Sequence, residues 1–209
     1  MKSFPAILAT VGTVAFLSLF VSACSSPASD GHDDNDHGAT TSANAGLAAS
    51  INDADMTFVT NMIPHHQQAI AMSALVQGRS TDPAVIKLAA DISAAQGPEI
   101  EVMSALQTQW VGGGLQPPGD HSGMPGTMPD HSAMEGMVDE ATMTKLASLK
   151  GTEFDTLWLR SMIGHHEGAI KMAQAEVANG ANADAKDLAQ KIVAAQQAEI
   201  TQMKQMLGE

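Results

Sequence analysis

Cysteine is almost absent from this 209-residue chain, in which Cys24 is the only one. A single cysteine excludes an internal disulfide, a cysteine-based metal cluster and the cysteine pair of a c-type haem attachment motif. Tyrosine is missing altogether, and only two Trp and five Phe accompany 14 Met. Basic residues are also few, with 10 Lys and Arg against 23 Asp and Glu. This acidic balance argues against nucleic acid as a partner and against electrostatic binding to anionic lipid.

The N-terminal stretch has the pattern of a secretory signal peptide. Lys2 precedes an apolar run over residues 6–21, which is too short and wrongly flanked for a stable membrane span. The run leads to Ala23-Cys24, an ending that resembles a bacterial lipobox. We therefore predict a lipoprotein signal peptide over residues 1–23 and lipidation of Cys24, which would anchor the protein on the extracytoplasmic face of the cell membrane. An ordinary signal peptide followed by a free cysteine is the alternative.

Beyond the signal peptide, the chain divides into a tether and a helical domain. Residues 24–51 are rich in Ser, Ala, Gly and Asp and lack periodicity, which predicts a flexible tether. The rest shows no alternation of period two, so we expect no sheet. Helices are expected near residues 53–77, 83–110, 139–149, 152–179 and 182–207, with N-terminal caps at Asn52, Asp82, Thr152 (with Asp155) and Asn182.

These expected helices predict an all-α fold class. Four long helices in two helix hairpins form a four-helix bundle over residues 52–209. The hairpins span residues 52–111 and 138–209, and a linker over residues 112–137 joins them.

One unit of the bundle is duplicated. Residues 62–72 read Met-Ile-x-His-His-x-x-Ala-Ile-x-Met, and the same pattern returns at residues 162–172. A Gln-x-x-Glu segment that ends at Glu99 returns, at the same offset, ending at Glu199. A constant offset over such a length indicates that one structural unit was repeated.

The repeated polar residues fall on the core faces of their helices. On a helical wheel His65 and His66 flank the apolar stripe, with Met62 between them. Glu99 and Met103 share one face of the next helix, and an antiparallel hairpin would bring that face to the level of the histidines. The predicted metal ligands are Met62, His65, His66, Met72, Glu99 and Met103, with their repeat partners Met162, His165, His166, Met172, Glu199 and Met203.

A purely structural role for these residues is the alternative. A buried carboxylate needs a proton, a cation or strong hydrogen bonds. A neutral histidine that donates to glutamate would satisfy this need and fix the register of the helices without any metal.

Helix-weakening residues stand directly before the candidate ligands. Pro64 precedes His65, and Gly97-Pro98 precede Glu99. An interior proline costs about 3 kcal/mol and frees a backbone carbonyl, so we expect interrupted helices and strain at the site. A helix that begins at Pro64 is the alternative.

The linker carries further ligand types of the same kind. It is rich in Gly and Pro and contains Asp-His-Ser-x-Met twice. A flexible polar loop and an accessory metal-capture segment explain this pattern equally well. The accessory candidates are His121, Met124, Met128, His131, Met134 and Met137.

The ligand types select the metal. Thioether sulfur is a poor ligand for Zn(II), Ca(II) and Mg(II) but a good one for Cu(I) and Ag(I), and imidazole suits copper in both oxidation states. A di-iron site fits poorly, because it needs two Glu-x-x-His pairs and two further glutamates in the core. The helices here offer Gln-x-x-Glu and His-His instead, and Glu167 is expected to point outward.

At these motifs the chain resembles the bacterial domain-of-unknown-function family numbered 305. The resemblance covers nearly everything from residue 53 to residue 207 and rests on the doubled Met-Ile-x-His-His segment. It implies a fold similar to the ferritin-like helical bundles, export from the cytoplasm and, for some members, copper binding and tolerance of copper or silver. Gly97-Pro98 departs from the family pattern and puts the continuity of the second long helix in question.

Together, the residues and the resemblance predict an extracytoplasmic, lipid-anchored helical bundle. It would bind a copper ion in the form of Cu(I), or else Ag(I), for sequestration or delivery. No nucleophile–base arrangement, phosphate loop or redox-cofactor motif occurs in the sequence, so we do not expect an enzyme. A ferritin-like oxidase that uses His and Glu on iron or copper is one alternative. A structural or partner-binding lipoprotein is the other.

Overall fold

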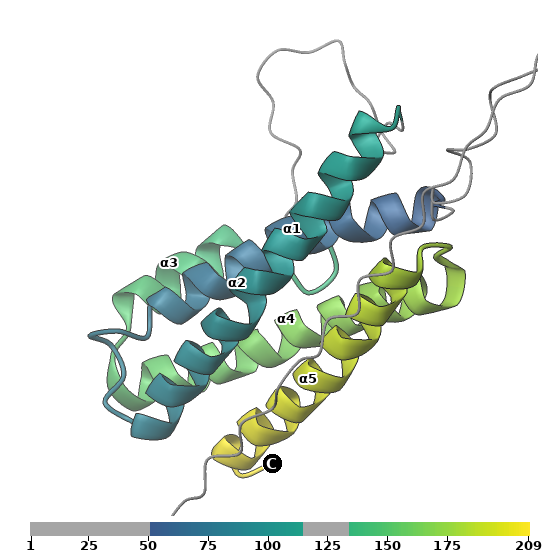
Figure 1. The fold of residues 1–209 in the computed structure, drawn as a ribbon. Coiled ribbons are helices and arrows are strands. Elements are labelled where there is room, and N and C mark those ends of the chain that lie inside the picture. The colour runs from purple at the N-terminus through teal and green to yellow at the C-terminus, as the bar shows by residue number, and fades with distance from the viewer. Residues whose placement is uncertain (1–50, 115–133) are drawn as a thin grey trace, which may run out of the picture. The chain divides into compact units, whose positions relative to one another are not determined.

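The computed structural model describes residues 51–114 and 134–209 (Figure 1), and these residues form five helices and no strand. The helices are α1 (Asp53–Ala74), α2 (Pro83–Gly112), α3 (Glu140–Ser148), α4 (Gly151–Asn179) and α5 (Ala183–Leu207). The predicted all-α helical bundle is therefore confirmed. The signal peptide, the tether and Cys24 lie outside the described residues, so those predictions stay open.

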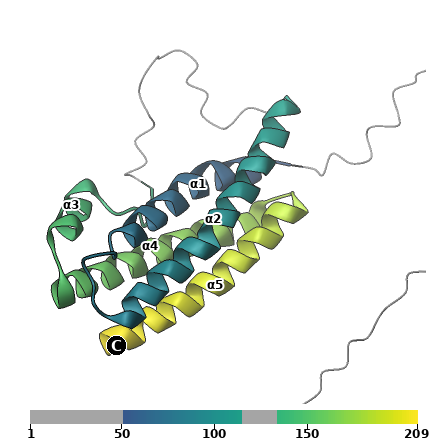
Figure 2. The ribbon, with the colours of Figure 1, turned by 60° about the vertical axis from the view of Figure 1, so that its left-hand side comes forward.

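The bundle consists of two helix hairpins, α1 with α2 and α4 with α5. The two hairpins meet mainly through α1 and α4, while α2 also approaches α5 (Figure 2). The Trp158 side chain on α4 donates from Nε1 to the backbone carbonyl of Met72 on α1, over 3.0 Å. The short helix α3 packs against α4. None of the helices in the described ranges is long and apolar enough to cross a membrane.

The apolar core falls into two clusters, and each long helix contributes to both. On α1 the residues up to Met62 belong to one cluster, and those from Ala69 onward belong to the other. On α4 the order is reversed, because Met162 and Ala169 lie in the opposite clusters. This exchange means that α1 and α4 run antiparallel, with the histidines of both helices between the two apolar clusters.

Most helix N-termini are capped as the sequence predicts. Asn52 and Asp55 form a capping box at the start of α1, and Asp82 caps α2 directly before a proline at the first helical position. Asn182 accepts a hydrogen bond from the backbone N–H of Ala185 and so caps α5. These caps satisfy N–H groups that have no partner within the helix.

The start of α4 differs from the expectation. Thr152 does not cap this helix: α4 begins at Gly151, its cap position is Lys150, and no side chain accepts a hydrogen bond there. The Gly151 N–H instead donates to the carbonyl of Arg79 in the α1–α2 turn, over 2.7 Å. A tertiary contact between the hairpins therefore replaces the local capping box.

Two predicted helix ends also shift. α1 ends at Ala74 rather than near residue 77, because a separate turn follows in which Gly78 adopts φ +74°. α2 continues to Gly112, beyond the predicted end near Trp110.

The prolines do not interrupt their helices. Pro64 lies inside α1, and Pro98 lies inside α2 after Gly97. The expectation of broken helices was wrong, and α1 does not begin at Pro64. Each proline removes one hydrogen-bond donor from the helix interior, but the long apolar stripes on both sides of it keep the helix continuous.

A buried carboxyl pair ties the start of α1 to the α4–α5 turn. Asp55 accepts hydrogen bonds from the backbone N–H groups of Ala181 and Asn182 in addition to that of Asn52. Burial would raise the pKa of Asp55, but these backbone hydrogen bonds hold it below its usual value. Burial, and then the neighbouring Asp55 carboxyl, raise the pKa of Glu176 to about 8. At neutral pH Glu176 therefore keeps its proton beside the ionised Asp55.

This pair predicts a loss of stability toward alkaline pH. The unfolded chain releases the Glu176 proton above its ordinary pKa of 4.5, whereas the folded protein holds it up to about 8. Folding thus takes up a proton in this range, and the free energy of unfolding falls as pH rises, by up to about 1.4 kcal/mol per pH unit. Glu176→Gln keeps a hydrogen-bond donor without the titration, so denaturant unfolding of this variant should show a flatter pH profile up to pH 8. Glu153→Gln, an exposed change on the same helix, is the control, and identical profiles for wild type and Glu176→Gln would contradict the raised pKa of Glu176.

Candidate metal site

A polar layer crosses the middle of the bundle between the two apolar clusters. It contains the four histidines of the repeated motif, each with at most 1% of its surface exposed. Gln96 on α2 and Gln196 on α5 complete the layer and are also buried. Buried polar groups normally find hydrogen-bond partners, so the partners of these six side chains decide what the layer does.

The second histidine of each motif pairs with a glutamate of its own hairpin. His66 Nε2 lies 2.9 Å from Glu99 Oε2, and His166 Nε2 lies 2.7 Å from Glu199 Oε2. With the proton on Nε2, each ring donates to the carboxylate and keeps a free lone pair on Nδ1. The Nδ1 atoms of His66 and His166 have no partner in the protein. The glutamates therefore orient the rings, and Nδ1 is the atom left to bind a ligand.

The two glutamates are less buried than the sequence suggests. Their side chains are 19% and 18% exposed, so each carboxylate reaches from its histidine toward the surface. Compensation by a buried cation is not required, because water and the imidazole N–H share the charge. This position makes Glu99 and Glu199 partners of the histidines rather than evident ligands of a metal.

The first histidines of the two motifs meet each other across the centre of the bundle. The rings of His65 and His165 have centroids 3.7 Å apart and planes inclined at 38°. None of their four nitrogen atoms has a hydrogen-bond partner. Burial, followed by the neighbouring His66, lowers the pKa of His65 to about 3, and burial likewise lowers the pKa of His165. Both rings are neutral at physiological pH, and each carries a lone pair that no protein group uses.

The two glutamines form a second set of unused polar groups. Both amide atoms of Gln96 and of Gln196 are buried without a partner. Both glutamines belong to the repeated unit but were not predicted as metal ligands. Their identical offset from Glu99 and Glu199 was the signal that they share the polar layer.

The six candidate methionines divide evenly between the two sides of this layer. Met62 and Met103 lie in one apolar cluster, against which the half-buried Met172 packs. Met72, Met162 and Met203 lie in the other cluster. Each side therefore holds three of the candidate thioethers, two from one hairpin and one from the other. All except Met172 are fully buried.

Within residues 51–114 and 134–209, no three side chains of the His, Cys, Asp and Glu types are arranged to hold a metal ion. The structure brings the histidines together in one layer, with thioethers above and below, but does not assemble a site of hard ligands. Glu167 is exposed, as expected. Of the accessory residues, His121, Met124, Met128 and His131 lie outside the described ranges, while Met134 and Met137 are partly buried.

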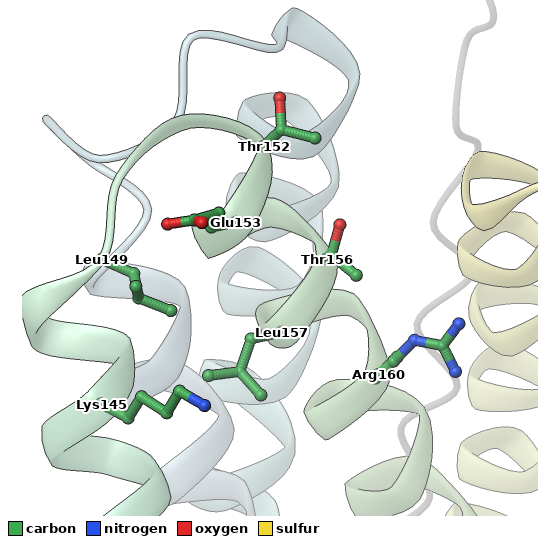
Figure 3. Close-up of a pocket in the computed structure, with 7 residues that line it drawn as sticks. All are labelled: Lys145, Leu149, Thr152, Glu153, Thr156, Leu157 and Arg160. Atoms are coloured by element: carbon green, nitrogen blue, oxygen red, sulfur yellow. The ribbon is translucent and has the colours of Figure 1, made fainter.

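A surface pocket elsewhere carries no comparable chemistry. It lies between α3 and the first turns of α4 and is lined by residues that include Lys145, Glu153 and Arg160 (Figure 3). Arg160 pairs with Glu209 near the C-terminus. None of the candidate ligands lines this pocket.

The fold and the layer define a class of protein: an antiparallel helical bundle with neutral imidazoles buried at its centre. The chain belongs to the family described as "Domain of unknown function (DUF305)", whose model matches residues 55–207. The resemblance inferred from the doubled motif is thus confirmed at the level of the family.

Solved structures of related proteins share the fold. A DUF305 fragment from Deinococcus radiodurans is 33% identical with a TM-score of 0.64, over 76% of this chain and 97% of its own. A candidate secreted protein of the family from Streptomyces coelicolor is 31% identical with a TM-score of 0.63, over 74% and 92%. CopM in its Cu(I)-bound form is 31% identical with a TM-score of 0.57, over 73% and 94%. CopM has also been solved in Cu(II)-bound, Ag-bound and apo forms.

A shorter match connects the chain to a viral protein. Protein L153 of Acanthamoeba polyphaga mimivirus is 40% identical over 52 residues. These residues are 25% of this chain and span only about a third, 34%, of that protein's length.

Proposed function

We propose that this protein binds a soft monovalent cation, Cu(I) or Ag(I), in the polar layer of its bundle, and that it sequesters or delivers copper. The observation that carries the proposal is the neutral His65–His165 pair, whose nitrogens are buried without partners. If these histidines served only to fix the register of the helices, their ring nitrogens would be expected to have hydrogen-bond partners in the protein. Leaving them unpaired costs stability, which is a common mark of a functional site.

The chain's own residues suit this metal. His65 and His165 would supply nitrogen from the two repeats, and a small rotation of the rings would turn their lone pairs toward one ion. Buried thioethers on both sides, such as Met62 and Met162, would supply the sulfur that Cu(I) and Ag(I) prefer over Zn(II). Glu99 and Glu199 would hold His66 and His166 in one tautomer, the usual role of a carboxylate behind a metal-binding histidine. The copper- and silver-bound forms of CopM support the choice of metal.

The proposal includes a location outside the cytoplasm. The apolar run before Cys24 has the pattern of an export signal, and the family relative from Streptomyces coelicolor is a candidate secreted protein. Lipid attachment at Cys24 would then keep the protein at the membrane surface, while the bundle itself binds the metal. No step of this function is catalytic.

A metal-dependent thermal shift tests the function directly. A ligand that binds only the folded state stabilises it by RT ln(1 + [L]/Kd), about 2.7 kcal/mol at a hundredfold excess over Kd. For a domain of this size this corresponds to roughly 5 to 10 °C in Tm. We expect shifts of this order for Cu(I), under anaerobic conditions, and for Ag(I). Fe(II) and Zn(II) should give much smaller shifts.

The pattern across the metals separates the alternatives. A larger shift with Fe(II) than with Ag(I) would favour a ferritin-like oxidase that uses His and Glu. If no metal moves the melting temperature, the polar layer is structural and the proposal fails.

A further inference from the structure

One segment of the described chain crosses the two central helices beside the histidine pair. Residues 134–138, called the strap below, form a turn closed by a hydrogen bond from the Met137 N–H to the Met134 carbonyl, over 3.1 Å. Gly136 occupies the third position of this turn with φ +86°, a conformation that favours glycine. The strap leads into α3 and is the described end of the Met-rich linker.

Helix α1 holds the strap through a single side chain. Gln68 donates from Nε2 to the Val138 carbonyl over 2.8 Å and accepts from the Val138 N–H at Oε1, also over 2.8 Å. The amide group thereby pairs with one residue as a neighbouring strand would. Gln68 lies one helical turn beyond His65, on the strap side of the layer.

Helix α4 contacts the strap closely at Gly168, because a glycine has no side chain to keep the two backbones apart. A Cβ atom on Gly168 would collide with the Glu135 carbonyl oxygen and lie 2.6 Å from the Gly136 Cα. A Cβ on Gly136 would lie 2.8 Å from the Gly168 Cα and 3.0 Å from the His165 carbonyl oxygen. Backbone thus meets backbone where the strap passes α4. An exposed Lys171–Glu135 ion pair adds little to this contact.

The two fixing points are equivalent positions of the repeat. Residues 68 and 168 stand at the same place in the two copies, yet one is a long amide and the other is glycine. The difference suits a single strap that accepts and donates hydrogen bonds to a side chain of α1 and packs against the backbone of α4. Its Glu135 carbonyl comes close enough to the His65 ring to oppose the fall in the pKa of that ring, although neither His65 nitrogen gains a hydrogen-bond partner.

We propose that the strap, held by Gln68 and Gly168, is the gate through which a metal ion reaches the His65–His165 pair. This inference rests on the proposed function, because it names the entry to the same site. The pair is at most 1% exposed, so an ion must displace some covering segment. Within residues 51–114 and 134–209, the strap is a non-helical segment that lies against both central helices, and its contacts with Gln68 and Gly168 can be lost without unwinding α1 or α4.

Gly168→Ala is the variant that separates the gate from the bundle. Its added methyl group should push the strap off α4 while favouring the helix itself. Gly164→Ala, one turn earlier on α4, is the matched control, because its Cβ would meet nothing within 4 Å. Gln68→Ala removes both hydrogen bonds to Val138 without adding an atom and serves as the second variant.

Two measurements on the full chain test the gate. The rate at which diethyl pyrocarbonate modifies His65 and His165, read by tandem mass spectrometry, reports exposure of the pair without metal. The rate of Cu(I) transfer from its bicinchoninate complex reports entry. We expect both rates to rise about tenfold or more in Gly168→Ala and Gln68→Ala, as for a closure weakened by about 1.4 kcal/mol, and to stay unchanged in Gly164→Ala.

The outcomes distinguish the gate from the function. If diethyl pyrocarbonate modifies the histidine pair faster in both strap variants, but both take up Cu(I) at the wild-type rate, the strap is a cover and not a gate. Unchanged modification in both variants also overturns the inference, since the strap would then not cover the pair. If neither wild type nor variants take up Cu(I), the proposed function fails and the metal gate fails with it, whatever the modification rates show.

Discussion

The double variant His65→Leu/His165→Leu is expected to melt at a higher temperature than the wild type and to lose its response to Cu(I). Each wild-type ring has two buried nitrogens without a partner. Removing an unsatisfied buried polar group in favour of an apolar one of similar size recovers about 1–3 kcal/mol. A gain of about 2 kcal/mol for the pair would raise Tm by roughly 4 to 8 °C. The metal-dependent shift should vanish, because the proposed nitrogen ligands are gone.

The neighbouring histidines provide the matched control. His66→Leu/His166→Leu makes the same chemical change one residue further along each motif, but it removes the hydrogen bonds to Glu99 and Glu199. These contacts involve a charged group, so their loss should lower the free energy of unfolding, by about 1–3 kcal/mol each. Opposite signs for the two double variants are therefore expected in the same denaturant titration. Destabilisation by both would mean that ordered water satisfies His65 and His165.

Acid should widen the gap between the wild type and His65→Leu/His165→Leu. In the unfolded chain a histidine takes up a proton below pH 6.5, whereas burial keeps the pKa of His65 at about 3 in the folded protein. The unfolded state then binds more protons, so the stability of the wild type falls as pH falls through this window, by up to about 1.4 kcal/mol per pH unit and histidine. The pKa of His165 is lowered for the same reason, and the leucine variant lacks both contributions.

Local signals predicted the starts of α1, α2 and α5, because a few adjacent residues encode each of them. The Asn52 capping box, the Asp82-Pro83 start of α2 and the Asn182 cap of α5 all follow from side chains that bond to the nearest backbone N–H groups. The start of α4 could not be predicted in this way. The Gly151 N–H finds its partner in the other hairpin, at Arg79, and nothing near Thr152 in the sequence reports that contact.

The sequence predicted that the four histidines lie on the core faces of their helices, but not which partner each histidine contacts. Periodicity placed both histidines of each motif on the core face, and the structure places all four there. On the wheel both histidines flank the apolar stripe, so the wheel alone does not tell which one reaches Glu99 and which one meets its repeat partner. The meeting of His65 with His165 depends on how two hairpins pack, which no spacing within one hairpin determines.

Contacts between distant segments account for the rest. Asp55 reaches the α4–α5 turn, and the strap pairs with Gln68, over separations at which the sequence carries no periodic signal. One departure from the repeat coincides with such a contact. Positions 68 and 168 differ, and it is at these two positions that the single strap contacts α1 and α4.

Replacing Met62 and Met162 by leucine should leave the metal-free protein nearly unchanged but collapse its thermal shift with Cu(I) and Ag(I). Leucine conserves the volume of methionine closely, and such changes in a packed core cost less than about 1.5 kcal/mol. Both side chains are fully buried, one in each apolar cluster beside the polar layer. The loss of two sulfur atoms therefore removes the proposed soft ligands without opening a cavity. Equal Cu(I) shifts in wild type and variant would assign these methionines to the core alone.

The companion variant Glu99→Gln/Glu199→Gln tests whether carboxylate oxygens, rather than thioethers, hold the metal. Glutamine keeps an oxygen that accepts from His66 and His166 Nε2, so the rings stay oriented. Loss of a carboxylate behind a ligand lowers metal affinity by about 10- to 100-fold, which reduces the Cu(I) shift but leaves it measurable at higher metal concentration. A ferritin-like iron site, in contrast, needs these carboxylates as ligands and would be abolished. If the glutamine variant loses all metal binding while the leucine variant keeps it, hard ligands hold the ion, and the copper proposal gives way to the oxidase.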